Sequence, residues 1–513
     1  MRRALTTIVA CTAASLLLAP AASAIDRVDT KKLRKGVTLD GILEHQRAFQ
    51  NIAIAHDDNR AATTSGYDAS VEYVSNRLRA AGYRVTLDEF DFPMWRQNGP
   101  AMLSETAPTP RPFTEGTDFI VAQFSSSGNV TANVVPTTDA GFPAPGGPGT
   151  STSGCEPGDF PAATAGNIAL MQRGTCPFTQ KYQMAKDAGA AAALIFNDGF
   201  PDREAPLATT APPNVGIPAA MISSQVGRSL WTEAQSGTVT LNMVVDATTT
   251  PNTEVNVIAD SPRGDRDRTI VVGAHLDSVA EGPGINDNGS GSSGILEIAE
   301  EVAELRNDRP RNRLRFAFWG AEEAGLVGST AYVAEQVQNG GIEDIEANLN
   351  FDMIGSPNFV RFVYDGDLSD SAPPPGGAPN GSGQIEQLFL RHFQRQGLAT
   401  DPTAFDGRSD YGAFIANGVP AGGLFTGAEQ LKTQRQQQIY GGFAGMPFDP
   451  NYHEDGDTFF NLSYTALDQM SDAAAHATWT LAESRSDVTD ARAAKVKRGK
   501  KGSWTYKGPF RVR

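Results

Sequence analysis

Three polar clusters that follow or separate apolar runs constrain this chain more than any other feature. His275 and Asp277 come directly after one strand-like run, and Glu322 and Glu323 come after the next. Asp287 lies between the two pairs, in a loop rich in Gly, Asn and Ser. The carboxyl ends of parallel strands meet at one edge of an open α/β sheet, where ligands bind, so we expect these side chains to gather there.

The segment between the two runs predicts a helix, because Ile295, Ile298, Val302 and Leu305 fall on one helical face. A strand, a helix and a second strand form a βαβ unit, whose strands are parallel. Similar patterns predict strands at 83–90, 349–355 and 420–426 and helices at 68–81, 384–396 and 464–481. Asp68 is expected to cap the first of these helices. We therefore predict an α/β domain with a mixed sheet that is parallel at its centre and flanked by helices.

Histidine and carboxylate side chains that converge at one edge suit zinc, an ion of borderline softness. Two metal ions close together need one bridging carboxylate and further ligands on each side. The candidates are Asp287 as the bridge, His275 and Asp352 around one ion, and Glu323 and His453 around the other. Each cluster alone has an ordinary alternative, since Asp after a strand often forms a turn and paired Glu often lies on a solvated helix face. Their joint order along one domain favours the two-metal interpretation.

Two acidic residues beside the expected ligands have separate expected roles. Asp277 stands two residues from His275, where it can orient the imidazole. Glu322 precedes Glu323, and a turn there can direct one carboxylate to metal and the other to water. Glu322 is therefore expected to act as general base and then as the acid for the leaving amine. The other histidines show no such setting and are expected to be structural or exposed: His45, His56, His392 and His476.

A change of composition from about residue 107 marks a second unit. Pro, Gly, Ser and Thr dominate 125–159. The residues that follow predict strands at 167–171, 192–196 and 217–222 and a helix at 179–189. This stretch contains no histidine and no cluster of acids, so we expect a small inserted domain for binding or gating rather than catalysis.

The first 24 residues are typical of a secretory signal peptide. Arg2 and Arg3 precede an apolar stretch, and the sequence Ala-Ser-Ala predicts cleavage after Ala24. The apolar stretch is too short for a lasting membrane anchor. The paired arginines leave a twin-arginine signal open and Cys11 leaves a lipoprotein signal open, but ordinary secretion is the simplest interpretation.

Two cysteines, Cys155 and Cys176, remain after cleavage. An even pair in an exported chain predicts a disulfide, and two free buried thiols are the alternative.

The formal net charge of -16 is unevenly distributed. Residues 492–513 contain nine basic side chains and no acidic one. Without this tail and the two leading arginines the chain carries about 27 net negative charges, so we expect no nucleic-acid partner. The tail is expected to contact an anionic surface, to be processed, or to remain a disordered end.

Five motifs follow one another in the order HLDSV (275–279), GINDNGSG (284–291), AFWGAEEAGLVGS (317–329), LNFDMIG (349–355) and YHEDGDT (452–458). Together they resemble the secreted bacterial zinc aminopeptidases that prefer leucine, a co-catalytic dizinc family that includes aminopeptidase Y. The resemblance covers about 41–90 and 253–484. It implies two zinc ions held by the ligands named above, Glu322 as catalytic base, and a cis peptide between Asp287 and Asn288.

Three further roles follow from the resemblance alone. Arg408 matches an arginine beside the substrate. Tyr452 matches a tyrosine near the reacting carbonyl, where it can donate to the developing oxyanion. Phe425 matches an apolar wall of the side-chain pocket.

The insert is similar to a protease-associated domain over about 129–245. The stretch RGTCPF at 173–178 and the residues after it give this resemblance. In such domains a pair like Cys155 and Cys176 is commonly bridged.

We therefore expect a signal peptide (1–24), the first part of a peptidase domain (25–115), an inserted β-rich α/β protease-associated domain (116–250), the catalytic part (251–485) and a basic tail (486–513). The expected function is that of a secreted, monomeric, zinc-dependent aminopeptidase that releases large hydrophobic residues from peptides with a free N-terminus. The alternatives are a metallo-carboxypeptidase or related amide hydrolase on the same scaffold, and a non-catalytic binding protein.

Overall fold

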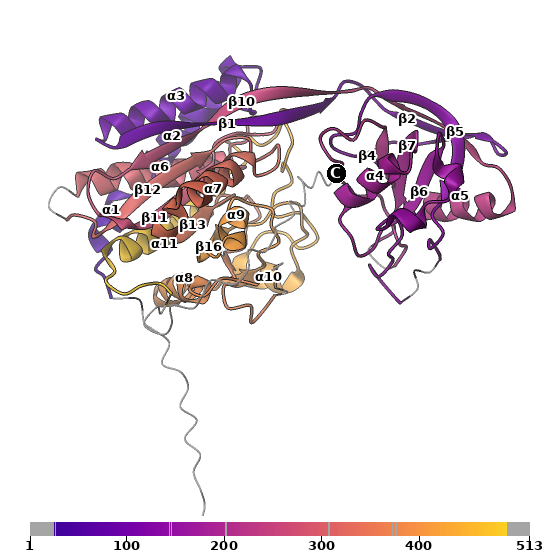
Figure 1. Cartoon of the computed structure of the whole chain (residues 1–513). Coiled ribbons are helices and arrows are strands. Elements are labelled where there is room, and N and C mark those ends of the chain that lie inside the picture. Colours follow the sequence, from indigo (N-terminus) through magenta and orange to yellow (C-terminus); the bar gives the residue numbers. More distant parts are fainter. Residues whose placement is uncertain are drawn as a thin grey trace, which may run out of the picture.

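The computed structural model describes residues 25 and 27–489, apart from 143, 145, 201–202, 306–307, 372 and 375–376. The expected signal peptide and most of the expected basic tail lie outside these residues. Figure 1 shows a larger α/β domain and a smaller β-rich domain, joined by a long two-stranded ribbon. Within the described part of the chain, none of the helices combines the length and the apolar character that a membrane span requires.

An eight-stranded mixed sheet forms the centre of the larger domain. Its spatial order is β1 (Arg84–Gln97), β10 (Ala247–Asp260), β12 (Asn312–Trp319), β11 (Asp265–His275), β13 (Ile345–Phe351), β16 (Ala421–Phe425), β14 (Phe362–Tyr364) and β15 (Asp401–Thr403). The four central strands from β12 to β16 are parallel, whereas β10 and β14 pair with them in antiparallel fashion. The sheet is thus mixed with a parallel centre, as the sequence predicts.

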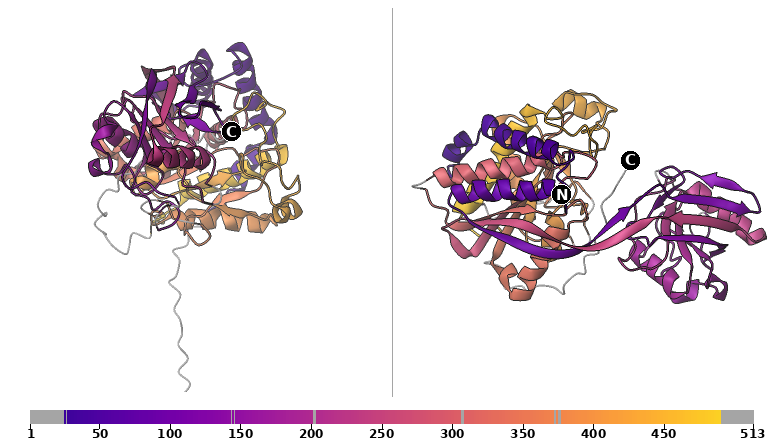
Figure 2. Two further views of the ribbon diagram at one scale, coloured as in Figure 1. Left: turned by 90° about the vertical axis from the view of Figure 1, so that its right-hand side faces the viewer. Right: turned by 90° about the horizontal axis from the view of Figure 1, so that it is seen from above.

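Helices cover both faces of this sheet. One face packs against α1 (Lys31–Gly36), α2 (Leu39–Ala55), α3 (Ser65–Ala80), α6 (Gly289–Glu304), α8 (Ser382–Gln396) and α11 (Tyr464–Glu483), whose apolar side chains form a continuous core with the strands. Figure 2 shows the indigo N-terminal helices alongside α6 on this face. The other face packs against α7 (Val327–Asn339) and α9 (Tyr411–Ala416). Short helices α10 (Gln434–Tyr440) and η3 (Gly341–Asp344) lie in the connections.

The smaller domain has its own eight-stranded sheet. Its spatial order is β3 (Arg111–Phe113), β2 (Met102–Ala107), β9 (Thr240–Val245), β5 (Gly128–Pro136), β6 (Ile168–Gln172), β7 (Ala192–Phe196), β8 (Ala219–Ile222) and β4 (Phe119–Val121). Helices α4 (Phe178–Asp187) and α5 (Ser224–Ser236) pack into two separate apolar clusters, and η1 (Pro157–Asp159) and η2 (Ala162–Thr164) are short turns. The predicted disulfide between Cys155 and Cys176 is present. The sheet already includes strands from Met102 onward, ahead of the expected boundary at 116.

The ribbon that joins the domains is longer than the strand expected at 83–90. Strands β1 and β10 pair without interruption from Arg84 opposite Asp260 to Gln97 opposite Ala247. Only the stretch from Val257 to Asp260 also pairs with β12. The rest of β1 and β10 extends beyond the sheet as a two-stranded ribbon. The chain therefore enters the smaller domain along β1 and returns along β10 (Figure 1).

Helix α3 begins earlier than the expected cap at Asp68. The Thr64 side chain accepts a hydrogen bond from the Tyr67 N–H and caps the helix, so Asp68 lies in the first turn. A carboxylate there still interacts favourably with the helix dipole. Gly82 follows the helix with a φ of +89°, as expected for a glycine that ends a helix.

Helix α6 starts in close contact with the end of β13. A Cβ atom on Gly291 would lie 2.1 Å from the Phe351 carbonyl oxygen and 2.4 Å from Asn288 Oδ1. Only glycine lets the first turn of α6 approach this strand so closely.

We predict that Gly291→Ala destabilises the protein by about 1–3 kcal/mol, because the added methyl must displace a backbone carbonyl. Alanine favours helix over glycine by roughly 1 kcal/mol, so helix propensity alone predicts the opposite sign. Urea unfolding followed by circular dichroism measures the change. Ser293→Ala on the same helix is the control, since the buried Ser293 hydroxyl has no hydrogen-bond partner. A Gly291→Ala protein as stable as the wild type would contradict the close contact.

Candidate metal centre

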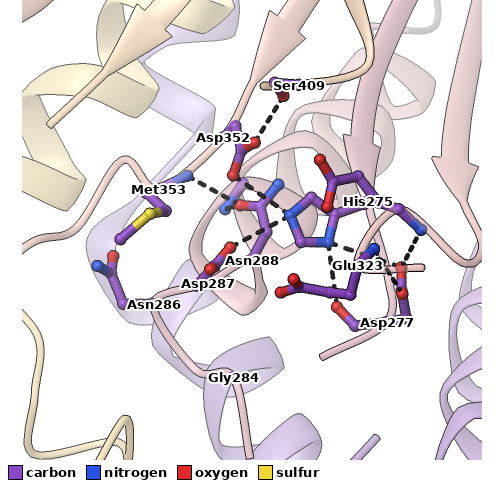
Figure 3. A network of polar contacts seen from close by, with 12 residues as sticks. His275, Asp277, Gly284, Asn286, Asp287, Asn288, Glu323, Asp352, Met353 and Ser409 are labelled. Atoms are coloured by element: carbon purple, nitrogen blue, oxygen red, sulfur yellow. Dashed lines mark hydrogen bonds and ion pairs between the residues drawn. The ribbon is translucent and has the colours of Figure 1, made fainter. Parts of the chain in front are cut away.

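Five side chains from separate segments meet at the carboxyl edge of the larger sheet. His275 ends β11, Glu323 follows β12, and Asp352 follows β13. Asp287 lies just before α6, and His453 comes from the loop that precedes α11. Figure 3 shows His275, Asp287, Glu323 and Asp352 directed toward a common centre. The structure thus brings together the complete set of ligands that the sequence predicts.

The two carboxylate oxygens of Asp287 face two different partners. Oδ1 lies 3.2 Å from His275 Nε2, which is itself 3.3 Å from Asp352 Oδ1. Oδ2 lies 3.2 Å from His453 Nε2, which is 3.1 Å from Glu323 Oε2. One carboxylate therefore separates two equivalent histidine–carboxylate pairs, which is the arrangement that a bridging ligand requires.

The donor atoms of this centre fit a metal. Glu323 Oε1 and Asp352 Oδ1 are buried and accept no hydrogen bond. Buried carboxylate oxygens are rarely left without a donor, so atoms of this kind suit a cation. Each half of the centre, His275–Asp287–Asp352 and Asp287–Glu323–His453, brings its ligand atoms within 4.8 Å of one another.

The charges in the centre are mutually dependent. Burial raises the pKa of Asp287, but the two histidines outweigh it and hold this pKa below its usual range. Burial lowers the pKa of His453, but Glu323 and Asp287 raise it to about 10. Metal binding here must displace any proton from the coordinating imidazole nitrogen, because only a neutral imidazole binds a metal ion.

Asp277 connects the imidazole with the turn that contains the paired glutamates. The Nδ1 atom of His275 lies 3.1 Å from the Asp277 carbonyl oxygen and 3.7 Å from its carboxylate. That carboxylate accepts hydrogen bonds from the backbone N–H groups of Glu322, at 3.1 Å, and Glu323, at 3.2 Å. The backbone of Asp277 thus contacts the imidazole more closely than the side chain does, and the side chain fixes the glutamate turn.

Two further side chains hold the ligands, and sequence reasoning missed them. Ser409 Oγ donates a 2.5 Å hydrogen bond to Asp352 Oδ2 and accepts one from Asn350 at 2.8 Å. Asp457 accepts bonds from the backbone N–H groups of Asn286 and Asp287, at 2.8 and 2.9 Å. Asp457 lies inside a quoted motif and Ser409 directly follows Arg408, but nothing in their spacing indicates these partners.

Arg60 is a third missed residue and lies fully buried beneath the centre. Its guanidinium donates to the carbonyl oxygens of Leu276, Pro283 and Gly284, at 3.0 Å for Pro283 and 2.7 Å for Gly284. These bonds fix both loops that carry His275 and Asp287. Burial lowers the pKa of Arg60 to about 10, although Asp277, Asp457 and Asp287 oppose the shift.

A pocket opens beside the metal centre. Glu322 lines it together with His275, Asp352 and His453, and aromatic side chains form an apolar wall: Phe362, Phe425 and Phe448. The rings of Phe425 and Phe362 stack with centroids 6.0 Å apart. The pocket therefore has a charged floor and an apolar side.

Tyr452 and Arg408, both expected near the substrate, form a connected pair in this pocket. Arg408 Nη2 lies 3.1 Å from the Tyr452 hydroxyl, and Nη1 donates to Glu429 at 2.7 Å. The Tyr452 ring stacks on His453 with centroids 3.9 Å apart. Glu429, which sequence reasoning also missed, balances the charge of Arg408.

Comparison with known proteins identifies the family. Residues 256–478 match the model of Peptidase family M28, and residues 130–230 match the PA domain. An aminopeptidase of Pseudomonas aeruginosa is 45% identical over 459 residues, which cover 88% of this chain and 82% of that protein. The chain belongs to peptidase family M28. It is a metallo-aminopeptidase that contains an inserted PA domain, as its motifs indicate.

Solved structures show the same fold. The aminopeptidase from Aneurinibacillus sp. strain AM-1 has a TM-score of 0.68 and 24% identity, covering 90% of this chain and 98% of that one. BSAP, a zinc aminopeptidase from Bacillus subtilis, has a TM-score of 0.55 and 23% identity, covering 90% and 97%. The peptide bond between Asp287 and Asn288 is cis, as the family resemblance implies.

We predict that Ser409→Ala weakens metal binding by this M28 peptidase about 10- to 100-fold, because Asp352 loses the donor that orients it. Competition with a calibrated chelator measures the affinity directly. Ser471→Ala is the matched control, since its buried hydroxyl has no hydrogen-bond partner. Equal affinities of the Ser409 and Ser471 variants would show that the bond to Asp352 does not position a ligand.

Proposed function

We propose that the protein is a secreted dizinc aminopeptidase that removes large hydrophobic residues from the N-terminus of peptides. The arrangement of Asp287 supports this most directly, because its two oxygens face separate histidine–carboxylate pairs at 3.2 Å. Glu322 lines the pocket beside them. Imidazole and carboxylate ligands together favour zinc among the common divalent ions.

Each zinc ion has a distinct set of proposed ligands. His275 and Asp352 would hold one ion, Glu323 and His453 would hold the other, and Asp287 would be shared between them. Bound there, the ions would activate a water molecule at neutral pH and polarise the substrate carbonyl.

Glu322 is the proposed proton carrier. The residue is only 9% exposed and lines the pocket next to the ligands. Burial raises the pKa of Glu322 well above its usual range, so the group can hold a proton taken from the attacking water. The same proton then passes to the leaving amine.

Tyr452 is proposed to donate its hydroxyl to the oxyanion that develops on the substrate carbonyl. Arg408 and Glu429 position this hydroxyl through the contacts described above. The apolar wall that includes Phe425 would receive the substrate's first side chain, which favours a large hydrophobic residue. Carboxylates near the metals would hold the free α-amine and so restrict cleavage to the first peptide bond.

The two alternative functions have weaker support. A carboxypeptidase needs a cation for the substrate carboxylate, but Arg408 pairs with Glu429 at 2.7 Å and lies beside Tyr452. A pure binding protein has no use for a buried acid such as Glu322 beside a complete set of ligands. Peptides with a free N-terminus are therefore the proposed substrates.

The organisation of the whole chain also remains a proposal. We retain a signal peptide at 1–24, a peptidase domain with an insert expected at 116–250, whose sheet also includes the strands from Met102 to Phe113, and a basic tail at 486–513. Secretion is consistent with the disulfide between Cys155 and Cys176, because such bonds persist in oxidising compartments. A monomer is the expected state.

We predict that Glu322→Gln lowers kcat on leucine p-nitroanilide about 10²- to 10⁴-fold, because the amide cannot accept a proton. The zinc content, measured by mass spectrometry, should remain that of the wild type. Glu335→Gln, on the exposed side of α7, is the control and should leave both values unchanged. An active Glu322→Gln enzyme would remove Glu322 from the reaction.

We further predict that leucyl peptides with a free N-terminus are cleaved and their N-acetylated forms are not. The acetyl group removes the positive charge that the carboxylates recognise. Chromatography of the products, with and without a chelator, measures both effects. If blocked and free peptides are cleaved at equal rates, the enzyme is a hydrolase of another specificity.

A further inference from the structure

A second group of potential metal ligands lies outside the active site, between helices α2 and α6. It consists of His45 on α2 and of Glu297 and Glu300 on α6, whose ligand atoms lie within 4.8 Å of one another. Within the described residues a third such group, Asp365, Asp367 and Glu386, has carboxylates that already accept backbone N–H bonds. The His45 group is the stronger candidate, because it also contains a buried imidazole nitrogen that has no hydrogen-bond partner.

The His45 ring is completely buried, and one of its nitrogens has no partner. Nδ1 is held by the Tyr73 hydroxyl at 2.8 Å. When Nδ1 donates to this hydroxyl, the lone pair of Nε2 points away from Tyr73. Nε2 lies 3.7 Å from Glu297 Oε2 and 3.8 Å from Glu300 Oε2, too far for a hydrogen bond to either. A buried imidazole nitrogen therefore faces two carboxylates across a gap.

The carboxylates on the other side of this gap are held in place. Glu297 Oε1 accepts a hydrogen bond from the Thr38 N–H at 3.1 Å, which leaves Oε2 directed toward His45. Arg77 binds both oxygens of Glu300, at 2.6 and 2.7 Å. Glu297 and Glu300 are three residues apart, so they share one face of α6. The Glu300 side chain is 20% exposed and leaves a route from solvent.

The local charge favours a cation. Arg77 is the one positive side chain within these contacts, and it binds Glu44 as well as Glu300. The carboxylates of Glu44, Glu297 and Glu300 therefore exceed the positive charge of Arg77 by two.

We propose that His45, Glu297 and Glu300 form a second site for a divalent transition-metal ion such as zinc. One imidazole nitrogen and two carboxylate oxygens supply three ligands, and water completes the coordination. The imidazole favours zinc over calcium, which prefers oxygen ligands alone. The site is separate from the active site, since Glu297 lies eight residues, or about 12 Å, along α6 from its first residue, Gly289.

The ion has a structural role in this arrangement. Helix α6 begins at Gly289, directly after Asp287 and Asn288 of the catalytic centre. An ion bound by His45 and Glu297 ties α2 to the following turns of α6. It stabilises the packing of the N-terminal helices against the helix that follows the active-site loop, without contacting the substrate.

The test compares zinc content after loading with zinc and dialysis into metal-free buffer. His45→Gln and Glu297→Gln should each contain one zinc equivalent less than the wild type. Their rates on leucine p-nitroanilide should be unchanged, and zinc should no longer raise Tm as much as in the wild type. Glu301→Gln, on the same helix but outside the three ligands, is the control and should retain all the zinc.

Diffraction at the zinc edge from wild-type crystals gives an independent measurement that needs no variant. An anomalous peak beside His45 Nε2 would support the site even if one variant fails to fold. Variants with the zinc content of the wild type, or crystals grown with zinc that show no peak there, would overturn the proposal. Unchanged rates distinguish the loss of this zinc from the loss of an active-site zinc, and the anomalous peak reports on the position beside His45 alone.

Discussion

The burial of many carboxylates at one sheet edge is the constraint on which this structure depends. Removing acids from water costs several kcal/mol each unless positive charge accompanies them. Asp287 is shared between His275 and His453, while Arg60 supplies a second, permanently charged group beneath the same loops. The parallel strands, the glycine contact at the start of α6 and the loop hydrogen bonds all serve to hold these groups at fixed distances.

Sequence patterns predict the ligands well because ligands at strand ends follow recognisable apolar runs. The residues that position the ligands could not be predicted from the sequence, for a physical reason. Arg60 binds backbone carbonyls, which any residue carries, and Ser409 meets Asp352 only after two distant segments fold together. The length of the ribbon was also underestimated, because the length of β1 depends on its pairing with the distant strand β10. The cap at Thr64 was missed because Asp68 offers the same chemistry four residues later.

The two sides of the pocket are built by different means. The metal side depends on backbone hydrogen bonds that fix acidic side chains, whereas the substrate side depends on ring packing and on the Arg408–Glu429 pair. The charge of Arg408 is thus balanced by Glu429 within the protein. The strongest electrostatic field in the pocket therefore lies on the side of the metal-centre carboxylates. This asymmetry agrees with membership of a metallo-aminopeptidase family, whose substrates are peptides.

The ribbon of β1 and β10 has an evolutionary consequence. Both strands leave and rejoin the catalytic sheet at the same outer edge, so the smaller domain is attached without interrupting any pairing between the central strands. A ribbon attached in this way allows the smaller domain to be exchanged or lost while the larger domain keeps its geometry. The smaller domain can therefore change in sequence without disturbing the strands that carry the metal-centre residues.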